Sequence, residues 1–195
     1  MTQVQQQQNG EITLLAIGGN APSHSGEPFK VVQAAIDAIK ACWGAVQISR
    51  FYQTPAFPAG AGPDFVNAAC VFYTNDSARD VLDTLHEIEA DFGRERTKRW
   101  GQRTLDIDLI GQGDSILPDV ATFERWYDLP LEDQLTSSPE MIILPHPRVQ
   151  DRSFVLVPLA DVAPYWTHPR LGLTTLQMLN ARPMEERHTV IPLIP

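Results

Sequence analysis

The segment Phe65–Thr74 most constrains the fold, because ten consecutive residues there are almost all apolar. A continuous apolar run of this length is typical of a central strand buried on both faces. Three further strands are expected at Thr13–Gly18, Val46–Thr54 and Thr104–Ile110, from apolar runs, β-branched residues or clean alternation. A turn at Gly18-Gly19-Asn20 is expected to end the first of them.

Two amphipathic helices are expected between these strands. Pro28 can open the first, whose apolar residues recur at helical spacing until Trp43. Ser77 and Asp80 can form a capping box that opens the second, and Gly93 ends it. The order strand, helix, strand, strand, helix, strand predicts an α+β fold with a ferredoxin-like βαββαβ core, in which both helices pack on one face of an antiparallel sheet.

The length of 195 residues suits one hydrophobic core. Residues 1–12 are glutamine-rich and have no basic or apolar region, so we interpret them as a disordered N-terminal tail and not as a secretory signal. Residues 13–195 are expected to form a single domain, with an acidic insertion or long loop at about 112–140. Phe154–Val162 and Thr174–Ala181 are expected to be short helices over the rest of the sheet. The apolar runs are far shorter than the roughly 20 residues that span a membrane, so a cytoplasmic protein is expected.

The charge distribution bears on the class of ligand. The net charge of −9 argues against a general nucleic-acid or membrane binder. Residues 94–103 nevertheless carry a local charge of +4, which leaves −13 on the rest of the chain. Such a basic window fits a compact polyanion such as a nucleoside triphosphate, or simply a solvated loop; charge alone leaves both open.

Asp106 and Asp108 are the most informative pair of residues. Because strand side chains alternate, both carboxylates leave one face while Leu105, Ile107 and Leu109 enter the core. A hard cation such as Mg²⁺ can bridge two such carboxylates and also take phosphate oxygens as ligands. The alternative is the solvated face of an edge strand. Arginines immediately before the pair favour phosphate chemistry, because the guanidinium fork suits phosphate oxygens.

Five sequence blocks occur in an order that resembles one enzyme family. The blocks are Phe51-Tyr52-Gln53-Thr54-Pro55, PDFVNAA at 63–69, GRER at 93–96, RWGQRTLDID at 99–108, and PHPR at 145–148 with Arg152 and Phe154. Over about residues 14–164 the chain resembles the 6-hydroxymethyl-7,8-dihydropterin pyrophosphokinases. The resemblance implies a ferredoxin-like fold and transfer of pyrophosphate from ATP to 6-hydroxymethyl-7,8-dihydropterin, which releases AMP, in folate biosynthesis.

The resemblance also implies roles for individual residues. Asp106 and Asp108 are expected to bind two Mg²⁺ ions with ATP, and Arg94 and Arg103 to engage the phosphates and assist the transfer. ATP binding is expected of Glu89, Arg96, His146 and Arg152. Pterin binding is expected of Thr54, Pro55, Phe57, Phe65, Asn67, Trp100 and Phe154.

Physical chemistry supports several of these roles. A flat bicyclic ring can stack between Phe65 and Phe154, and the amide of Asn67 offers both a donor and an acceptor. Trp100 is expected to close over the pocket. The alternatives are that Phe65 and Phe154 belong to the core and that His146 is an ordinary loop residue.

Two other kinds of protein fit parts of the sequence. An RNA-binding module shares the strand order, but the acidic charge and the lack of an RNP-type aromatic strand argue against it. A catalytically silent pterin or nucleotide sensor is the second. The expected partners are ATP and the pterin, without nucleic acid or membrane, and a monomer is expected.

Overall fold

The structure is a computed structural model that describes residues 10–56, 62–93, 104–130, 133 and 137–193. Its elements follow one another in the order β1 (Glu11–Gly19), α1 (Pro28–Trp43), β2 (Gln47–Ile48), β3 (Tyr52–Thr54), β4 (Phe65–Thr74), α2 (Ala78–Asp91), β5 (Asp106–Gln112), α3 (Val120–Tyr127), η1 (Val149–Asp151), α5 (Ser153–Val162), α6 (Thr175–Ala181), α7 (Met184–His188) and β6 (Ile191–Pro192).

The strands form one antiparallel sheet in the order β5-β1-β4-β3-β6, with β2 also paired to β4. The apolar segment Phe65–Thr74 is β4, a central strand, as its composition predicts. The α+β class and the antiparallel sheet with helices packed on it are confirmed. The positions of β5, β1, β4 and β3 are compatible with a ferredoxin-like core.

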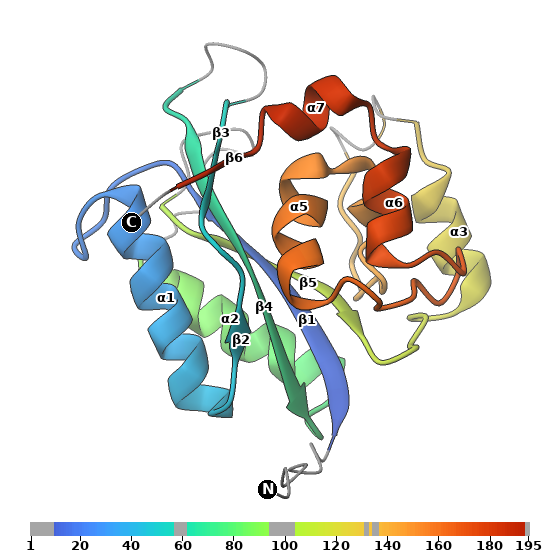
Figure 1. The fold of residues 1–195 in the computed structure, drawn as a ribbon. Helices are drawn as coiled ribbons and strands as arrows, with labels where there is room; N and C mark the ends of the chain where they lie inside the picture. The colour runs from blue at the N-terminus through green and yellow to red at the C-terminus, as the bar shows by residue number, and fades with distance from the viewer. Residues whose placement is uncertain (1–9, 57–61, 94–103, 131–132, 134–136, 194–195) are drawn as a thin grey trace, which may run out of the picture.

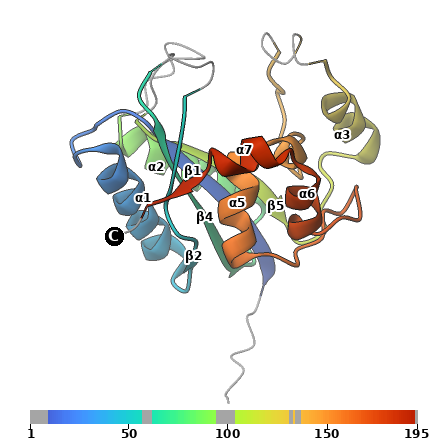
Figure 2. The same ribbon diagram turned by 45° about the horizontal axis from the view of Figure 1, so that its top comes forward.

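Helices cover both faces of this sheet, as Figure 1 shows. α1 begins at Pro28, and α2 begins after Ser77, whose hydroxyl accepts a hydrogen bond from Asp80 N. Both helices pack on one face, against core residues such as Leu15 and Ile17. α5 covers the opposite face, where it packs against Leu14 and other residues of β1 and β4. Figure 2 shows α6 and α7 beside α5, with α3 at the outer end of that layer.

The single strand expected over Val46–Thr54 is broken into β2 and β3. The pairing with β4 shifts by one residue between Ile48 and Tyr52, which is the signature of a β-bulge. Ser49 lies in the bulge, where its hydroxyl accepts a hydrogen bond from Ala69 N. The next residue, Arg50, pairs with Asp161 of α5 through two side-chain hydrogen bonds of 3.0 and 2.7 Å. Long-range side-chain contacts therefore decide where this strand is interrupted.

Other boundaries also differ from the expectations. β1 begins at Glu11, so Glu11 and Ile12 belong to the sheet and not to a tail. It continues through Gly18 and Gly19, where a turn was expected, because both residues pair with β4. The segment 112–140, expected as an insertion or long loop, contains helix α3, capped by Asp119. The two short C-terminal helices are confirmed as α5 and α6, whereas α7 and β6 were not expected.

Among the described residues, no helix combines the length and the apolar character needed to cross a membrane.

Candidate active site

Asp106 and Asp108 occupy the start of β5, an edge of the sheet among the described strands. Ile107 and Leu109 enter the core beneath α1 and α2, so alternation places both aspartates on the other face. Both residues are half-buried. This exposure fits a site that meets solvent-borne ligands better than it fits a fully solvated strand face.

Gly18 of β1 lies between Asp106 and Asn67, the asparagine that is expected to bind the pterin. It pairs with Asp106 on one side and with Asn67 of β4 on the other. Directly paired residues of an antiparallel sheet present their side chains on the same face. Asn67 and Asp106 therefore emerge on the α5 face, separated by two strand spacings, or about 10 Å between backbones.

Asn67 is 6% exposed and has a defined orientation. Its Nδ2 donates to Thr54 Oγ1 at 2.7 Å, and a Cβ added to Gly18 would lie 2.8 Å from its Oδ1. Thr54 pairs with Phe65 across β3 and β4, which brings the phenyl ring to the same face. These contacts bring Thr54, Phe65 and Asn67 together, as expected.

The two expected stacking residues are not core residues. Phe65 is half-buried at the start of β4, and Phe154 is 42% exposed near the start of α5. The guanidinium of Arg152 lies 5.9 Å from the centre of the Phe154 ring. Pro55, also expected in the pterin pocket, is exposed just after β3.

Arg152 also approaches the metal-binding candidates. Its Nη1 lies 3.3 Å from Asp108 Oδ2, and the two side chains are 34% and 35% exposed. The guanidinium thus supplies positive charge next to a carboxylate that is expected to hold a cation. An expected ATP-binding residue, Arg152, therefore contacts an expected metal ligand, Asp108.

Glu89 supports the same strand from helix α2. Its side chain is almost fully buried, and Oε1 accepts a hydrogen bond of 2.7 Å from the backbone N–H of Ile107. Ile107 stands between the two aspartates. Glu89 thus fixes the backbone between Asp106 and Asp108. This structural role is distinct from the ATP contact that was expected of Glu89.

His146 is positioned by a second bulge in the sheet. The register between β1 and β5 shifts at Leu14 and Leu15, which leaves Ile110 as the extra residue. The carbonyl of Ile110 accepts a hydrogen bond of 2.8 Å from His146 N. His146 Nδ1 accepts from Arg148 N at 3.1 Å, so Nε2 carries the proton of the neutral ring. Burial, assisted by the positive charge of Arg152, lowers the pKa of His146 to about 3.

A cavity of about 360 Å³ runs along this edge of the sheet, between α2, β5 and the segment 139–146. Asp108 and His146 contribute polar groups to its lining. Leu82, Leu109 and Ile142 contribute apolar side chains. A cavity that is apolar in part and reaches a metal-binding candidate is suited to a ligand with a flat base and a charged tail. Leu82 and Ile142 were not among the expected site residues, because apolar residues give no local signal that separates a ligand pocket from the core.

Five of the expected site residues lie outside the described part of the chain. They are Phe57, Arg94, Arg96, Trp100 and Arg103. The described residues alone contain no group of three or more His, Cys, Asp or Glu side chains arranged to hold a metal ion. Two carboxylates remain suitable for Mg²⁺, because this ion commonly binds one or two carboxylates and completes its shell with water and substrate phosphates.

Comparison with known proteins identifies the family of the chain. The model of the family 7,8-dihydro-6-hydroxymethylpterin-pyrophosphokinase (HPPK) matches residues 14–164, more than three quarters of the chain. The chain belongs to the HPPK family. This finding confirms the resemblance carried by the five sequence blocks and disfavours the RNA-binding alternative.

Relatives extend the match beyond the family segment. A 2-amino-4-hydroxy-6-hydroxymethyldihydropteridine pyrophosphokinase of Synechocystis sp. is 34% identical over 181 residues, 92% of this chain and 79% of the relative. Its counterpart from Pseudomonas aeruginosa is 35% identical over 88% of this chain and 91% of the relative. The crystal structure of Plasmodium falciparum HPPK-DHPS aligns with a TM-score of 0.60 at 14% identity, over 87% of this chain and 44% of that one. At this identity the structural likeness supports the HPPK fold alone.

Proposed function

We propose that the chain transfers pyrophosphate from ATP to 6-hydroxymethyl-7,8-dihydropterin in folate biosynthesis, through the site described above. One observation carries the site assignment: Gly18 pairs with both Asn67 and Asp106. The two strands that flank β1 thereby present an amide for the pterin and a carboxylate for the metal on one face, about 10 Å apart. This separation suits a pterin whose hydroxymethyl group reaches phosphates held at the aspartates.

The ATP site is proposed along the β5 edge. The apolar side chains of Leu82, Leu109 and Ile142 suit a flat purine base, and Asp108 and His146 line the same cavity. A neutral His146 with a proton on Nε2 can donate a hydrogen bond to a ribose or phosphate oxygen. Arg152 lies beside Asp108 and supplies a guanidinium for phosphate oxygens.

Asp106 and Asp108 are proposed to hold Mg²⁺, with two ions expected when ATP is bound. The metal would supply charge neutralisation at the phosphate oxygens. Arg152 pairs with Asp108 through one oxygen at 3.3 Å, which balances part of the carboxylate charge. We propose that Arg152 turns from Asp108 to the phosphates when the nucleotide binds. Glu89 keeps the two aspartates in place by holding the N–H of Ile107.

The pterin is proposed to lie over the ends of β3 and β4. The Asn67 amide, held by Thr54, presents Oδ1 and the second Nδ2 hydrogen to the polar edge of the ring. Phe65 and the exposed Phe154 are proposed to stack on its two faces. Pro55, just after β3, is proposed to belong to the same pocket. Phe57 and Trp100, which lie outside the described residues, are also proposed to contact the pterin.

The reaction requires little covalent chemistry from the protein, because phosphoryl transfer depends mainly on positioning and charge stabilisation. The hydroxymethyl oxygen attacks the β-phosphorus of ATP, and the bond from that phosphorus to the α–β bridging oxygen breaks. The hydroxyl proton passes from the attacking oxygen to solvent water, and AMP departs with the bridging oxygen on its phosphate. Arg94, Arg96 and Arg103, also outside the described residues, are proposed to engage the phosphates together with Arg152.

A nucleotide product assay tests this function. Purified protein with Mg²⁺, ATP and the pterin should form AMP, and not ADP, in step with pterin consumption, and EDTA should stop the reaction. Asp108→Asn should reduce turnover by at least 100-fold. Asp114→Asn is the matched control, since Asp114 is an exposed aspartate in the turn just beyond the opposite end of β5. ADP as the product would contradict the reaction class, and binding of both substrates without turnover would favour the sensor alternative.

Three finer expectations are part of the same proposal: a monomer, a cytoplasmic location, and one domain, which includes Glu11 and Ile12 of β1 as well as residues 13–195. None of the site contacts described above requires a second chain.

A further inference from the structure

The C-terminal residues beyond the HPPK match contact two chain segments that carry proposed pterin-binding residues, β3 with Thr54 and the segment that leads to Phe154. The family match ends at residue 164, and the chain continues through α6, α7 and β6. β6 adds to the sheet beside β3, with Tyr52 opposite Pro192, and Leu193 N donates to Phe51 O at 2.8 Å. The strand that carries Thr54 therefore has a partner on both sides.

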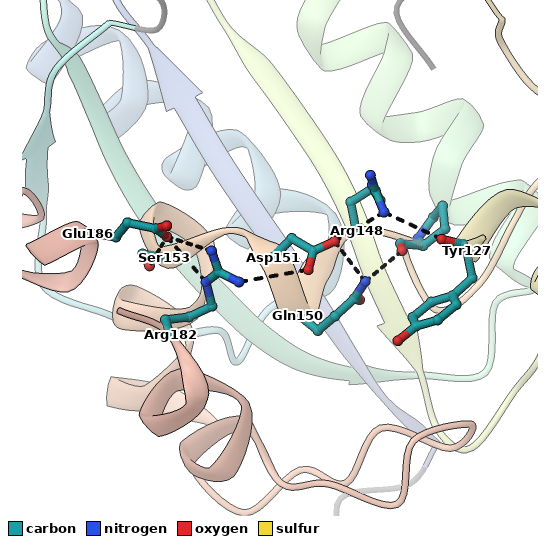
Figure 3. Close-up of polar contacts among 8 residues, drawn as sticks. Tyr127, Arg148, Gln150, Asp151, Ser153, Arg182 and Glu186 are labelled. Atoms are coloured by element: carbon teal, nitrogen blue, oxygen red, sulfur yellow. Dashed lines mark hydrogen bonds and ion pairs between the residues drawn. The ribbon is translucent and has the colours of Figure 1, made fainter. Parts of the chain in front are cut away.

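Arg182, between α6 and α7, reaches the segment that precedes α5. Figure 3 shows its guanidinium between the carboxylates of Asp151 and Glu186. The contacts to Glu186 Oε2 measure 2.7 Å from Nη2 and 3.2 Å from Nε. Nη1 lies 3.9 Å from Asp151 Oδ1. The Arg182 side chain is only 22% exposed, so it is held between these partners and not extended into solvent.

The contacts continue from Arg182 into residues 148–153, which lead to Phe154. Arg148 Nη1 lies 3.2 Å from Asp151 Oδ2 and also donates to the carbonyl of Tyr127 at the end of α3. On the other side, Ser153 Oγ donates to Glu186 Oε2 at 3.4 Å. Asp151 and Ser153 are thus both held, and the residue between them is Arg152.

The local backbone hydrogen bonds just before Arg152 are those of a short turn, from Asp151 N to Arg148 O at 3.2 Å and from Arg152 N to Val149 O at 3.3 Å. η1 is a single 3₁₀ turn of three residues, and Arg152, which precedes α5, makes no side-chain cap for that helix. Short 3₁₀ turns have poor hydrogen-bond geometry and rarely persist by themselves. Partly exposed ion pairs also contribute little to overall stability. The effect of this network is therefore expected to be local, on the direction of the Arg152 and Phe154 side chains.

We propose that Arg182 is a positioning residue: by pairing with Asp151 and Glu186, it orients Arg152 toward the phosphates and Phe154 toward the pterin. This inference rests on the proposed function, because it takes Arg152 and Phe154 as substrate contacts. It extends the active site to a residue that touches neither substrate and lies outside the family match.

The test compares Arg182→Gln with the matched control Arg170→Gln. Arg170 is also in the C-terminal region and also pairs with a carboxylate, that of Glu124, but on α3 and away from Arg152. We expect Arg182→Gln to raise the KM for the pterin and for ATP by 5- to 20-fold each. The control should change either value less than 2-fold, and both variants should unfold at the urea concentration of the wild type.

A double-mutant cycle separates positioning from general damage. If Asp151 acts through Arg182, Arg182→Gln should cause little further loss in an Asp151→Asn background. Glu186→Gln, which keeps the shape of the side chain, should reproduce part of the effect and provides a second variant if Arg182→Gln folds poorly. Kinetics of Arg182→Gln equal to those of the control, or additive losses in the cycle, would overturn the inference.

Failure of the proposed function would be seen separately, in the wild type. If the wild type forms no AMP, calorimetric titration of the same variants with ATP and with the pterin replaces kinetics. Weaker binding by Arg182→Gln than by Arg170→Gln would still support the positioning role. Equal binding would refute it.

Discussion

Gly18→Ala is predicted to damage pterin binding selectively. The new Cβ would lie 2.8 Å from Asn67 Oδ1, closer than such atoms approach in proteins, so the Asn67 amide must move. The amide is not free to yield, because Nδ2 is held by Thr54 at 2.7 Å and the residue is 6% exposed. Moving it breaks the Thr54 hydrogen bond or misdirects the groups that face the pterin.

The size of the effect follows from this contact. A buried polar group left without its partner costs about 1–3 kcal/mol. At about 1.4 kcal/mol per tenfold change, the dissociation constant of the pterin should rise roughly 5- to 150-fold. ATP affinity should change less than about 2-fold, because the nearest contact of the new Cβ is with Asn67.

Gly111→Ala provides the matched control for this experiment. A Cβ at Gly111 would also meet a side-chain atom at 2.8 Å, but that atom belongs to Trp166. Both substitutions therefore strain the sheet by a similar close contact, and only one of them involves the pterin asparagine. The assay is calorimetric titration of each variant with the pterin and, separately, with an ATP analogue. Unchanged pterin affinity in Gly18→Ala, or equal losses for both ligands, would refute the reasoning.

Two further predictions concern buried polar groups. Glu89→Ala should lower stability by about 1–3 kcal/mol and raise the Mg²⁺ concentration needed for half-maximal rate, because the Ile107 N–H loses its acceptor. Glu89→Gln keeps an acceptor oxygen, so its stability and its Mg²⁺ requirement should both stay close to those of the wild type. Equal changes in Glu89→Gln and Glu89→Ala would argue against this role. His168 is fully buried, and burial lowers its pKa to about 4. The unfolded chain binds this proton below about pH 6.5, so His168 should by itself lower stability by about 2 kcal/mol between pH 7 and pH 5, in addition to the fall caused by His146. Urea unfolding at both values should show a smaller fall in His168→Asn; an identical fall would exclude His168 as the cause.

The amino-acid sequence by itself determined the local features of this protein. The apolar run of Phe65–Thr74 predicted a central strand, and the alternation after Leu105 predicted that Asp106 and Asp108 share one face. Pro28 and Ser77 predicted where α1 and α2 begin. These features depend on residues within one or two turns of chain, so periodicity and capping chemistry are sufficient to find them. The ordered motifs, taken together, predicted the family.

Only the tertiary structure decided which distant segments meet. The sequence predicts Gly18 at the end of a strand, where the chain enters a turn, yet its pairing with both Asn67 and Asp106 places it at the centre of the site. Arg50, in the break between β2 and β3, contacts Asp161, more than a hundred residues away, and Arg182 contacts Asp151 from the C-terminal end of α6. Such contacts have no local signature, because strand register and packing between distant elements choose each partner. Local patterns therefore determined the elements and the chemistry they carry, and packing determined the geometry in which they act.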